Sequence, residues 1–132
     1  MFKKLFPVFI LLVAIYLINF LLYDNIYSAY NQIHLDKLMH LAGGMAIAWL
    51  AIVFFAARLN YLPSFDRFLI LLGMVALVGV LWEFAEYLGQ FIPTISHYLS
   101  GGDLADTLGD LAADLSGGAI VILHLLWRRK AQ

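Results

Sequence analysis

The stretch from residue 68 to residue 91, FLILLGMVALVGVLWEFAEYLGQF, is apolar almost throughout and carries Glu83 and Glu86 near its end. A hydrocarbon layer of about 30 Å requires about 20 mostly apolar residues in a helix, so this stretch is long enough to cross a bilayer. Each backbone amide inside lipid must be satisfied by its own segment, which predicts a helix. An ionisable side chain at membrane depth costs at least about 2.5 kcal/mol, so Glu83 and Glu86 indicate a functional site.

Three further stretches have the same character, and they cover residues 5–22, 38–57 and 107–127. We therefore predict an all-α polytopic membrane protein, in which four transmembrane helices form one compact bundle and residues 1–132 form a single transmembrane domain. Lys3 and Lys4 before the first stretch are also typical of a secretory signal. The apolar run that follows is longer than the usual run of about 7–15 residues, which favours an uncleaved anchor.

The composition excludes several classes of protein. Of all residues, 64% are apolar and 13% are charged. A soluble domain this short could not bury so much apolar surface, whereas a bilayer removes that requirement. A formal net charge of -1 argues against a nucleic-acid binder built on a basic surface. The absence of cysteine excludes disulfides, thiolate metal sites and a cysteine nucleophile.

The charged residues are segregated between the two sides of this topology. All the basic residues except Lys37 fall on one side: Lys3, Lys4, Arg58, Arg67, Arg128, Arg129 and Lys130. Lys and Arg accumulate in cytoplasmic loops, so we predict that both termini and the 58–67 loop are cytoplasmic. All the acidic residues except Asp66 fall on the opposite, outer side.

Several of these acids share one depth and one face. At 1.5 Å of rise per residue, His40, Glu83 and Asp110 each lie about 24–27 Å from the basic residue at the inner end of their helix. Residues four apart in a helix differ by about 40° in direction, so Asp106, Asp110 and Asp114 share a face. The sequence therefore predicts a polar vestibule at the outer end of the bundle.

So many carboxylates in a low-dielectric pocket must be protonated, paired or neutralised by a bound cation. Carboxylate oxygens suit Mg²⁺, Ca²⁺ or Mn²⁺, and a histidine would also admit Zn²⁺ or Fe²⁺. The Glu-x-x-His pair of di-iron bundles is missing, so that cofactor is not predicted. The predicted ligands of a divalent cation are His40, Glu83, Glu86, Asp106 and Asp110. The predicted catalytic residues are Glu83, Asp110 and Asp114, and Asp36, Lys37 and Asp103 are assigned to the same site.

Several of these residues have simpler explanations. His40 alone fits a neutral, hydrogen-bonded helix residue, and Glu86 and Asp106 lie near enough to the interface to be solvated. Asp103 or Asp106 fits an N-terminal cap of the last helix. Lys37 fits a salt bridge that holds the bundle together, made with Asp36 or with an acid of the third helix.

Three motifs occur in a recognisable order. Asp36-Lys37-x-x-His40 opens the second helix, Trp82-Glu83-x-x-Glu86 closes the third, and Gly102-Asp103-x-x-Asp106-Thr107-x-x-Asp110 opens the fourth. Over residues 36–118 this set resembles the bacterial YjdF-type inner-membrane family and, more distantly, the VanZ-like proteins, whose founding members are associated with teicoplanin resistance. The resemblance implies a helical fold in the bacterial inner membrane, facing the cell envelope, and no established reaction.

Three functions remain open at this stage. The first is a metal-assisted enzyme acting at the outer leaflet on an envelope lipid or a lipid-linked substrate. The second is proton or cation transport, for which a chain this small would have to form a homo-oligomer. The third is a non-catalytic accessory protein whose acid cluster is structural. All three place the protein among membrane lipids, without a nucleic-acid partner.

Overall fold

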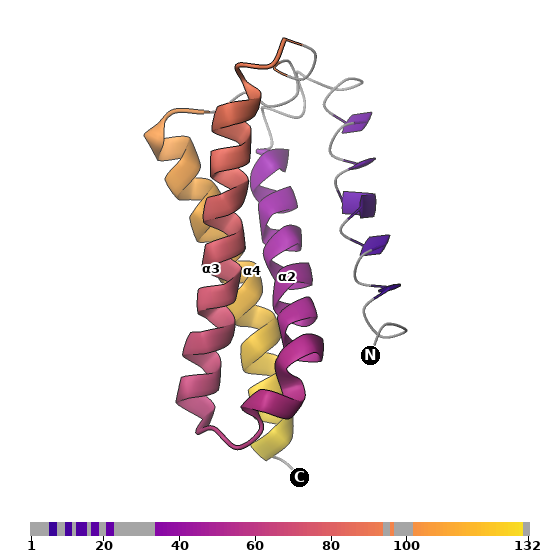
Figure 1. Ribbon diagram of the computed structural model, residues 1–132, viewed down its shortest axis with the longest axis vertical. Coiled ribbons are helices and arrows are strands. Elements are labelled where there is room, and N and C mark those ends of the chain that lie inside the picture. Colours follow the sequence, from indigo (N-terminus) through magenta and orange to yellow (C-terminus); the bar gives the residue numbers. More distant parts are fainter. Residues whose placement is uncertain are drawn as a thin grey trace.

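A computed structural model of the chain describes residues 34–93, 96 and 102–130, together with residues 6, 7, 10, 11, 13–15, 17, 18, 21 and 22. Three long helices make up most of this part: α2 (Leu35–Leu59), α3 (Ser64–Gly89) and α4 (Leu104–Lys130). In the view of Figure 1 they run down, up and down beside one another, and α4 crosses behind α2 and α3. The all-α prediction is confirmed.

Three helices of the described part are long and apolar enough to cross a membrane, with candidate spans at Leu35–Phe55, Ser64–Gly89 and Leu104–Trp127. Large apolar side chains point away from the bundle, and Leu81 and Phe84 of α3 are 57% and 60% exposed. A helix that is apolar all round needs lipid on the faces that no protein covers. The predicted first helix, residues 5–22, lies only partly within the described residues, and those that are described are helical.

The helix boundaries differ from the predicted ranges 38–57, 68–91 and 107–127. Each helix begins three or four residues earlier, at Leu35, Ser64 and Leu104, because its first turn also contains polar residues that lie outside the apolar run. Helix α3 ends at Gly89, two residues before the predicted end near Phe91. Phe91 and Ile92 donate to the carbonyls of Leu88 and Gly89 in a tight turn, and Pro93 follows. A proline cannot continue a helix, which explains the stop near Gly89.

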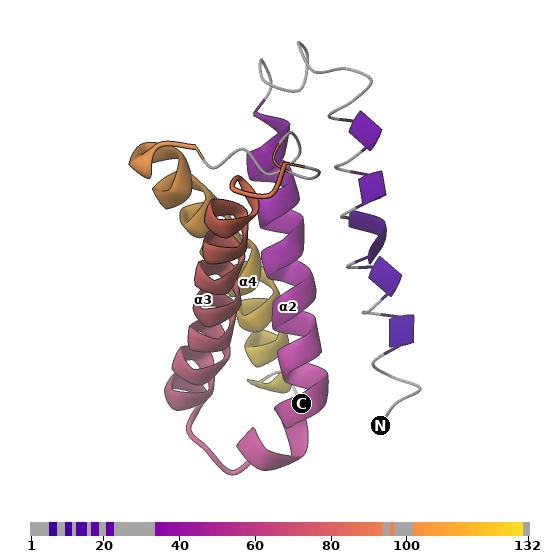
Figure 2. The ribbon, with the colours of Figure 1, turned by 45° about the horizontal axis from the view of Figure 1, so that its top comes forward.

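The most extensive helix pairing is between α2 and α4. Glycines make it possible: a Cβ added to Gly44 would collide with the backbone of Asp114, and one added to Gly117 would collide with the carbonyl of Leu41. Backbones approach this closely in membrane helices only where side chains are small. The view in Figure 2 shows the same close pairing, with α3 laid against both helices.

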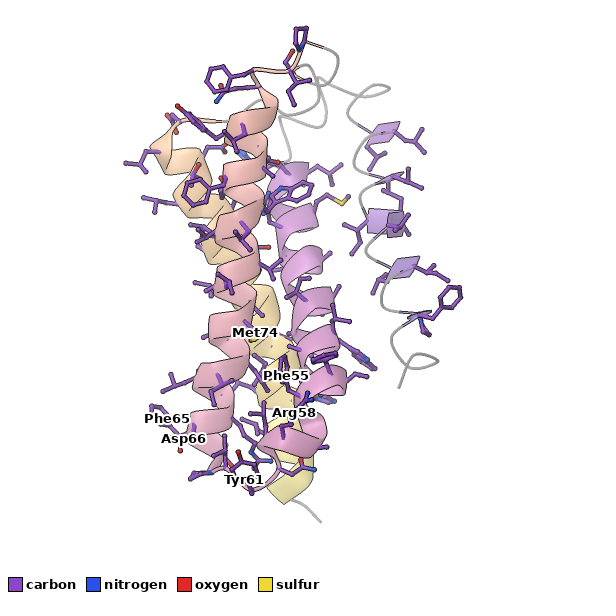
Figure 3. All side chains as sticks on the ribbon, in the orientation of Figure 1. Phe55, Arg58, Tyr61, Phe65, Asp66 and Met74 are labelled. Atoms are coloured by element: carbon purple, nitrogen blue, oxygen red, sulfur yellow. The ribbon has the colours of Figure 1, made fainter. Side chains whose placement is uncertain are left out.

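Apolar residues fill the half of the bundle nearer the α2–α3 link. The core consists of buried residues from all three helices: Ala48, Ala51, Leu59, Leu71, Val75, Ile122 and Leu126. Phe55 of α2 and Met74 of α3 pack against this core, and both are labelled in Figure 3. The described polar cluster lies in the other half of the bundle.

The link between α2 and α3 and the end of α4 lie at the same end of the bundle (Figure 1). Arg58, Tyr61, Phe65 and Asp66 gather there (Figure 3). The Arg58 guanidinium carbon lies 5.7 and 6.0 Å from the ring centres of Phe54 and Phe55, a cation–π arrangement that suits a membrane interface. That this end faces the cytoplasm remains a prediction, since it rests on charge distribution alone.

Candidate functional site

The polar cluster forms where α2 begins, α3 ends and α4 begins, opposite the α2–α3 link. Each helix contributes ionisable side chains within its first or last few turns. They are Asp36, Lys37 and His40 on α2, Glu83 and Glu86 on α3, and Asp106, Asp110 and Asp114 on α4. The down-up-down topology is what brings these three segments to one end of the bundle.

Helix α4 carries the most buried acids of the cluster. Asp110 is 4% exposed and Asp114 is 7% exposed, whereas the side chain of Asp106 is 42% exposed. The four-residue spacing keeps all three on the face that meets α2. Burial of a carboxylate is tolerated only when it is paired or hydrogen-bonded, and the partners of Asp110 and Asp114 come from α2.

Asp103 stands just before α4 and caps it. Its Oδ1 accepts a hydrogen bond of 2.9 Å from the backbone N–H of Asp106, and its carbonyl accepts the first helical bond from Thr107. Of the two capping residues considered from the sequence, Asp103 is therefore the one that acts. It positions the start of α4.

Removing this cap should destabilise the protein modestly. Asp103→Ala leaves the Asp106 N–H without its acceptor, and we expect a loss of about 1 kcal/mol in unfolding free energy. Asp103→Asn and Asp103→Ser keep a capping oxygen and should behave like the wild type in thermal unfolding in detergent. Equal losses in all three variants would contradict the capping role.

Lys37 links α2 to α4. Its Nζ lies 3.2 Å from Asp36 Oδ2 and 2.8 Å from Asp110 Oδ1, and it also donates to Asp106 Oδ1. The sequence left open a partner on Asp36 or on the third helix. The salt bridges described by the structure are with Asp36 and with two acids of α4, because α2 packs most closely against α4.

His40 lies one turn deeper on the same face of α2. Its Nδ1 is 3.3 Å from Asp114 Oδ2, and its Nε2 is 3.6 Å from Asp110 Oδ1. A carboxylate that accepts from one ring nitrogen fixes the orientation of the ring and leaves the other nitrogen for a ligand. Asp114 therefore orients His40, and the Nε2 atom of His40 faces Asp110.

Glycines on two helices make room for Asp114. A Cβ on Gly79 of α3 would lie 2.7 Å from Asp114 Oδ2, and one on Gly43 of α2 would lie 3.8 Å from Asp114 Oδ1. The sequence shows these glycines beside the acids, but it does not show that they face Asp114. Their role becomes visible only when the three helices are placed together.

Glu83 completes a compact group of three possible metal ligands. One ligand atom each of His40, Glu83 and Asp110 lies within 4.8 Å of the others. Glu83 Oε1 is buried and has no hydrogen-bond partner among the described residues, while the Thr107 side chain is within hydrogen-bonding reach of the same carboxylate. Thr107 was quoted in a sequence motif but was not assigned to the site.

The remaining predicted ligands are placed differently. Glu86 accepts a hydrogen bond of 2.9 Å from Trp82 Nε1 and is not part of the group around His40. Asp106 belongs to a second group with Asp36 and Asp110, the one that surrounds Lys37. The five predicted metal ligands therefore do not form one group in the structure, and their function as ligands remains a prediction.

The charges of the cluster do not balance. Six carboxylates face one lysine and one histidine: Asp36, Glu83, Glu86, Asp106, Asp110 and Asp114. Lys37 forms salt bridges with Asp36, Asp106 and Asp110 and so offsets negative charge at the end of the cluster. We call Asp36 and Asp106 the rim acids. Among the described residues, the imidazole of His40 is the one basic group on the deeper side, around Glu83, so a proton or a cation is needed there to offset the remaining negative charge.

Comparison with known proteins places this architecture in a family. A family model described as "Predicted membrane protein (DUF2238)" matches residues 1–131, and this is the family that the YjdF-type resemblance indicated. The more distant resemblance to VanZ-like proteins receives no support. No curated protein and no solved structure gives a significant match. The chain belongs to the DUF2238 family of predicted membrane proteins.

Proposed function

We propose that this protein is an integral protein of the bacterial inner membrane that binds a divalent cation through His40, Glu83 and Asp110, on the outer side, and acts on an envelope lipid or a lipid-linked substrate. Both termini would then be cytoplasmic, as the positions of Lys and Arg favour. The observation that carries the proposal is the buried Glu83 Oε1 atom, which has no hydrogen-bond partner among the described residues, in a carboxylate that lies within 4.8 Å of ligand atoms of His40 and Asp110. A buried carboxylate oxygen without a partner is costly unless a proton or a cation satisfies it.

The surroundings of His40 support a cation rather than a proton. Asp114 holds Nδ1, so Nε2 is directed toward Asp110, as in metal sites where a second carboxylate orients the ligating histidine. Two carboxylates and one imidazole leave open coordination positions on a divalent ion. Such an ion would polarise a phosphoryl or acyl oxygen, or lower the pKa of a bound water.

Position favours a lipid as the substrate. The cluster lies within helices that are long enough to span the bilayer, and its neighbours on α3 are exposed apolar residues such as Phe84 and Leu88. A polar headgroup at that level could reach the ion while its chains stay in the hydrocarbon layer. Glu86, held by Trp82 and outside the ligand group, is the proposed general base, and Asp114 is reassigned to positioning His40.

The test is the metal content of the protein purified in detergent, measured by elemental mass spectrometry. We expect about one equivalent of a divalent metal in the wild type. Glu83→Gln and Asp110→Asn should bind the metal at least about 10-fold more weakly, because even the loss of a residue that only orients a ligand has an effect of that size. Asp66→Asn is the matched control, because it also removes an acid from α3, but one that is exposed and lies at the opposite end. It should retain the metal.

The same variants test the lipid reaction. Turnover of outer-leaflet phospholipids or lipid-linked intermediates should disappear in Glu83→Gln together with the metal. Retention of both activity and metal in that variant would contradict the proposal.

A structural function is the second candidate, and Lys37 favours it. The contacts of Lys37 with three carboxylates fasten the first turns of α2 to α4, as an accessory protein without chemistry would also need. Added divalent cation would then stabilise the protein, by about 2.7 kcal/mol at 100 times the dissociation constant, with no turnover of any lipid. Proton or cation transport finds less support, because the apolar core closes the other half of the described bundle.

A further inference from the structure

The ammonium group of Lys37 lies among carboxylates, in a position where a metal cation could otherwise bind. An ammonium group has three N–H donors, and three carboxylates surround Nζ. Nζ donates to Asp110 Oδ1 at 2.8 Å and to both the Oδ1 atom and the backbone carbonyl of Asp106, the carbonyl at 3.2 Å, and Asp36 Oδ2 forms an ion pair with it at 3.2 Å. With all its donors engaged, the ammonium has none left for the charged group of a substrate.

The acids around Lys37 lie close enough together to hold a metal ion. One oxygen each of Asp36, Asp106 and Asp110 lies within 4.8 Å of the others. Asp110 also belongs to the group with His40 and Glu83. Two cation positions therefore share the carboxylate of Asp110, as in two-metal sites, and the chain's own ammonium is seated in one of them.

The fold keeps a path clear for this side chain. A Cβ added to Gly109 of α4 would lie 3.1 Å from Lys37 Cε and 3.5 Å from Nζ. The lysine stem thus crosses α4 where the helix has no side chain, between the two acids that it binds one turn apart. A bulky residue at position 109 would compete with the stem for this space.

We infer that Lys37 is a built-in second cation, which limits the centre to a single metal ion. The inference rests on the proposed function, since the one remaining ion is the one assigned to His40, Glu83 and Asp110. Lys37 is then a positioning residue: it fixes Asp110 and neutralises the rim acids. A substrate anion meets the metal ion, because the lysine has no free donor for it.

The experiment counts metal ions with and without the ammonium. Wild type, Lys37→Met and Lys37→Arg are purified in detergent and titrated with Mn²⁺, and bound metal per chain is measured by elemental mass spectrometry and by electron paramagnetic resonance. We expect the Mn²⁺ ratio to double in Lys37→Met, with the spectrum of a spin-coupled pair. Lys37→Arg keeps the charge and should keep the wild-type ratio. Lys37→Gln is measured in parallel, so that poor folding of one variant leaves the comparison intact.

The outcomes separate this inference from the proposed function. One ion in the wild type and in both uncharged variants would contradict the inference that Lys37 takes the place of a second metal ion. It would leave the proposed metal centre unaffected. No ion in the wild type, but one in Lys37→Met and Lys37→Gln, would support Lys37 as a cation and contradict the proposed centre. Two ions in the wild type, or none in any protein, would overturn the inference.

Discussion

Gly44→Ala is expected to destabilise the helix bundle by about 3 kcal/mol, the upper end of the usual cost of overpacking. The added methyl group would lie 2.7 and 2.8 Å from the backbone carbon and Cα of Asp114, and closer still to the carbonyl oxygen. Backbone atoms of α4 cannot rotate out of the way as a side chain can. The two helices must therefore separate, which also draws Asp114 away from His40.

The matched control is Gly73→Ala on α3. Gly73 is also inside a long helix, but a Cβ there meets nothing within 4 Å. Alanine is the better helix former by about 1 kcal/mol in water, so this variant should be neutral or slightly stabilised. The measurement is the unfolding free energy in detergent for both variants and the wild type.

Two results would contradict the packing of α2 on α4. A Gly44→Ala variant as stable as the wild type would mean that Gly44 does not touch α4. A loss at Gly73 as large as that at Gly44 would mean that glycine is required for flexibility and not for close approach. If the proposed metal centre exists, Gly44→Ala should also weaken metal binding, because Asp114 orients His40.

The length and polarity of the apolar stretches were enough to predict α2, α3 and α4, since a bilayer accepts few alternatives to a helix. The ends were less predictable. Polar residues such as Asp36, Ser64 and Asp103 lie at the helix starts, outside the apolar runs. A hydrophobic pattern alone therefore does not locate these starts. The first predicted helix, residues 5–22, lies only partly within the residues that the structure describes.

The cluster was predictable in depth but not in detail. Counting residues from the basic ends puts His40, Glu83 and Asp110 at similar heights, and the structure brings their ligand atoms within 4.8 Å. Counting cannot show how each helix is rotated or which helices pair most closely. That is why Asp106 was grouped with His40, although it lies one turn nearer the end and contacts Lys37.

The pairing of Lys37 with Asp110 should produce the strongest side-chain coupling in the cluster. Its atoms are 2.8 Å apart, and the two side chains are 26% and 6% exposed. We expect a coupling of about 2 kcal/mol in a double-mutant cycle of Lys37→Met and Asp110→Asn. Lys37→Met leaves the buried charge of Asp110 without its ammonium partner, whereas the double variant has no charge at position 110, so its cost should be well below the sum.

The cycle is measured as unfolding free energy in detergent with a chelator present, because Asp110 is also a proposed metal ligand. Lys37→Met combined with Asp66→Asn is the control, since Asp66 lies at the opposite end of the bundle. Distant sites add within about 0.5 kcal/mol, and this control pair should do so. Additivity of the Lys37 and Asp110 variants would contradict the direct pairing.

The neighbouring pair gives the sharper comparison. Asp36 is 3.2 Å from the same ammonium, but its side chain is 32% exposed, so water competes for both charges. Exposed ion pairs contribute about 0.2–1 kcal/mol, and the Asp36 cycle should fall in that range. If burial determines these energies, the coupling to Asp110 exceeds the coupling to Asp36. Equal couplings would mean that Asp110 is as hydrated as the rim, and a hydrated Asp110 could not enclose an ion together with Glu83.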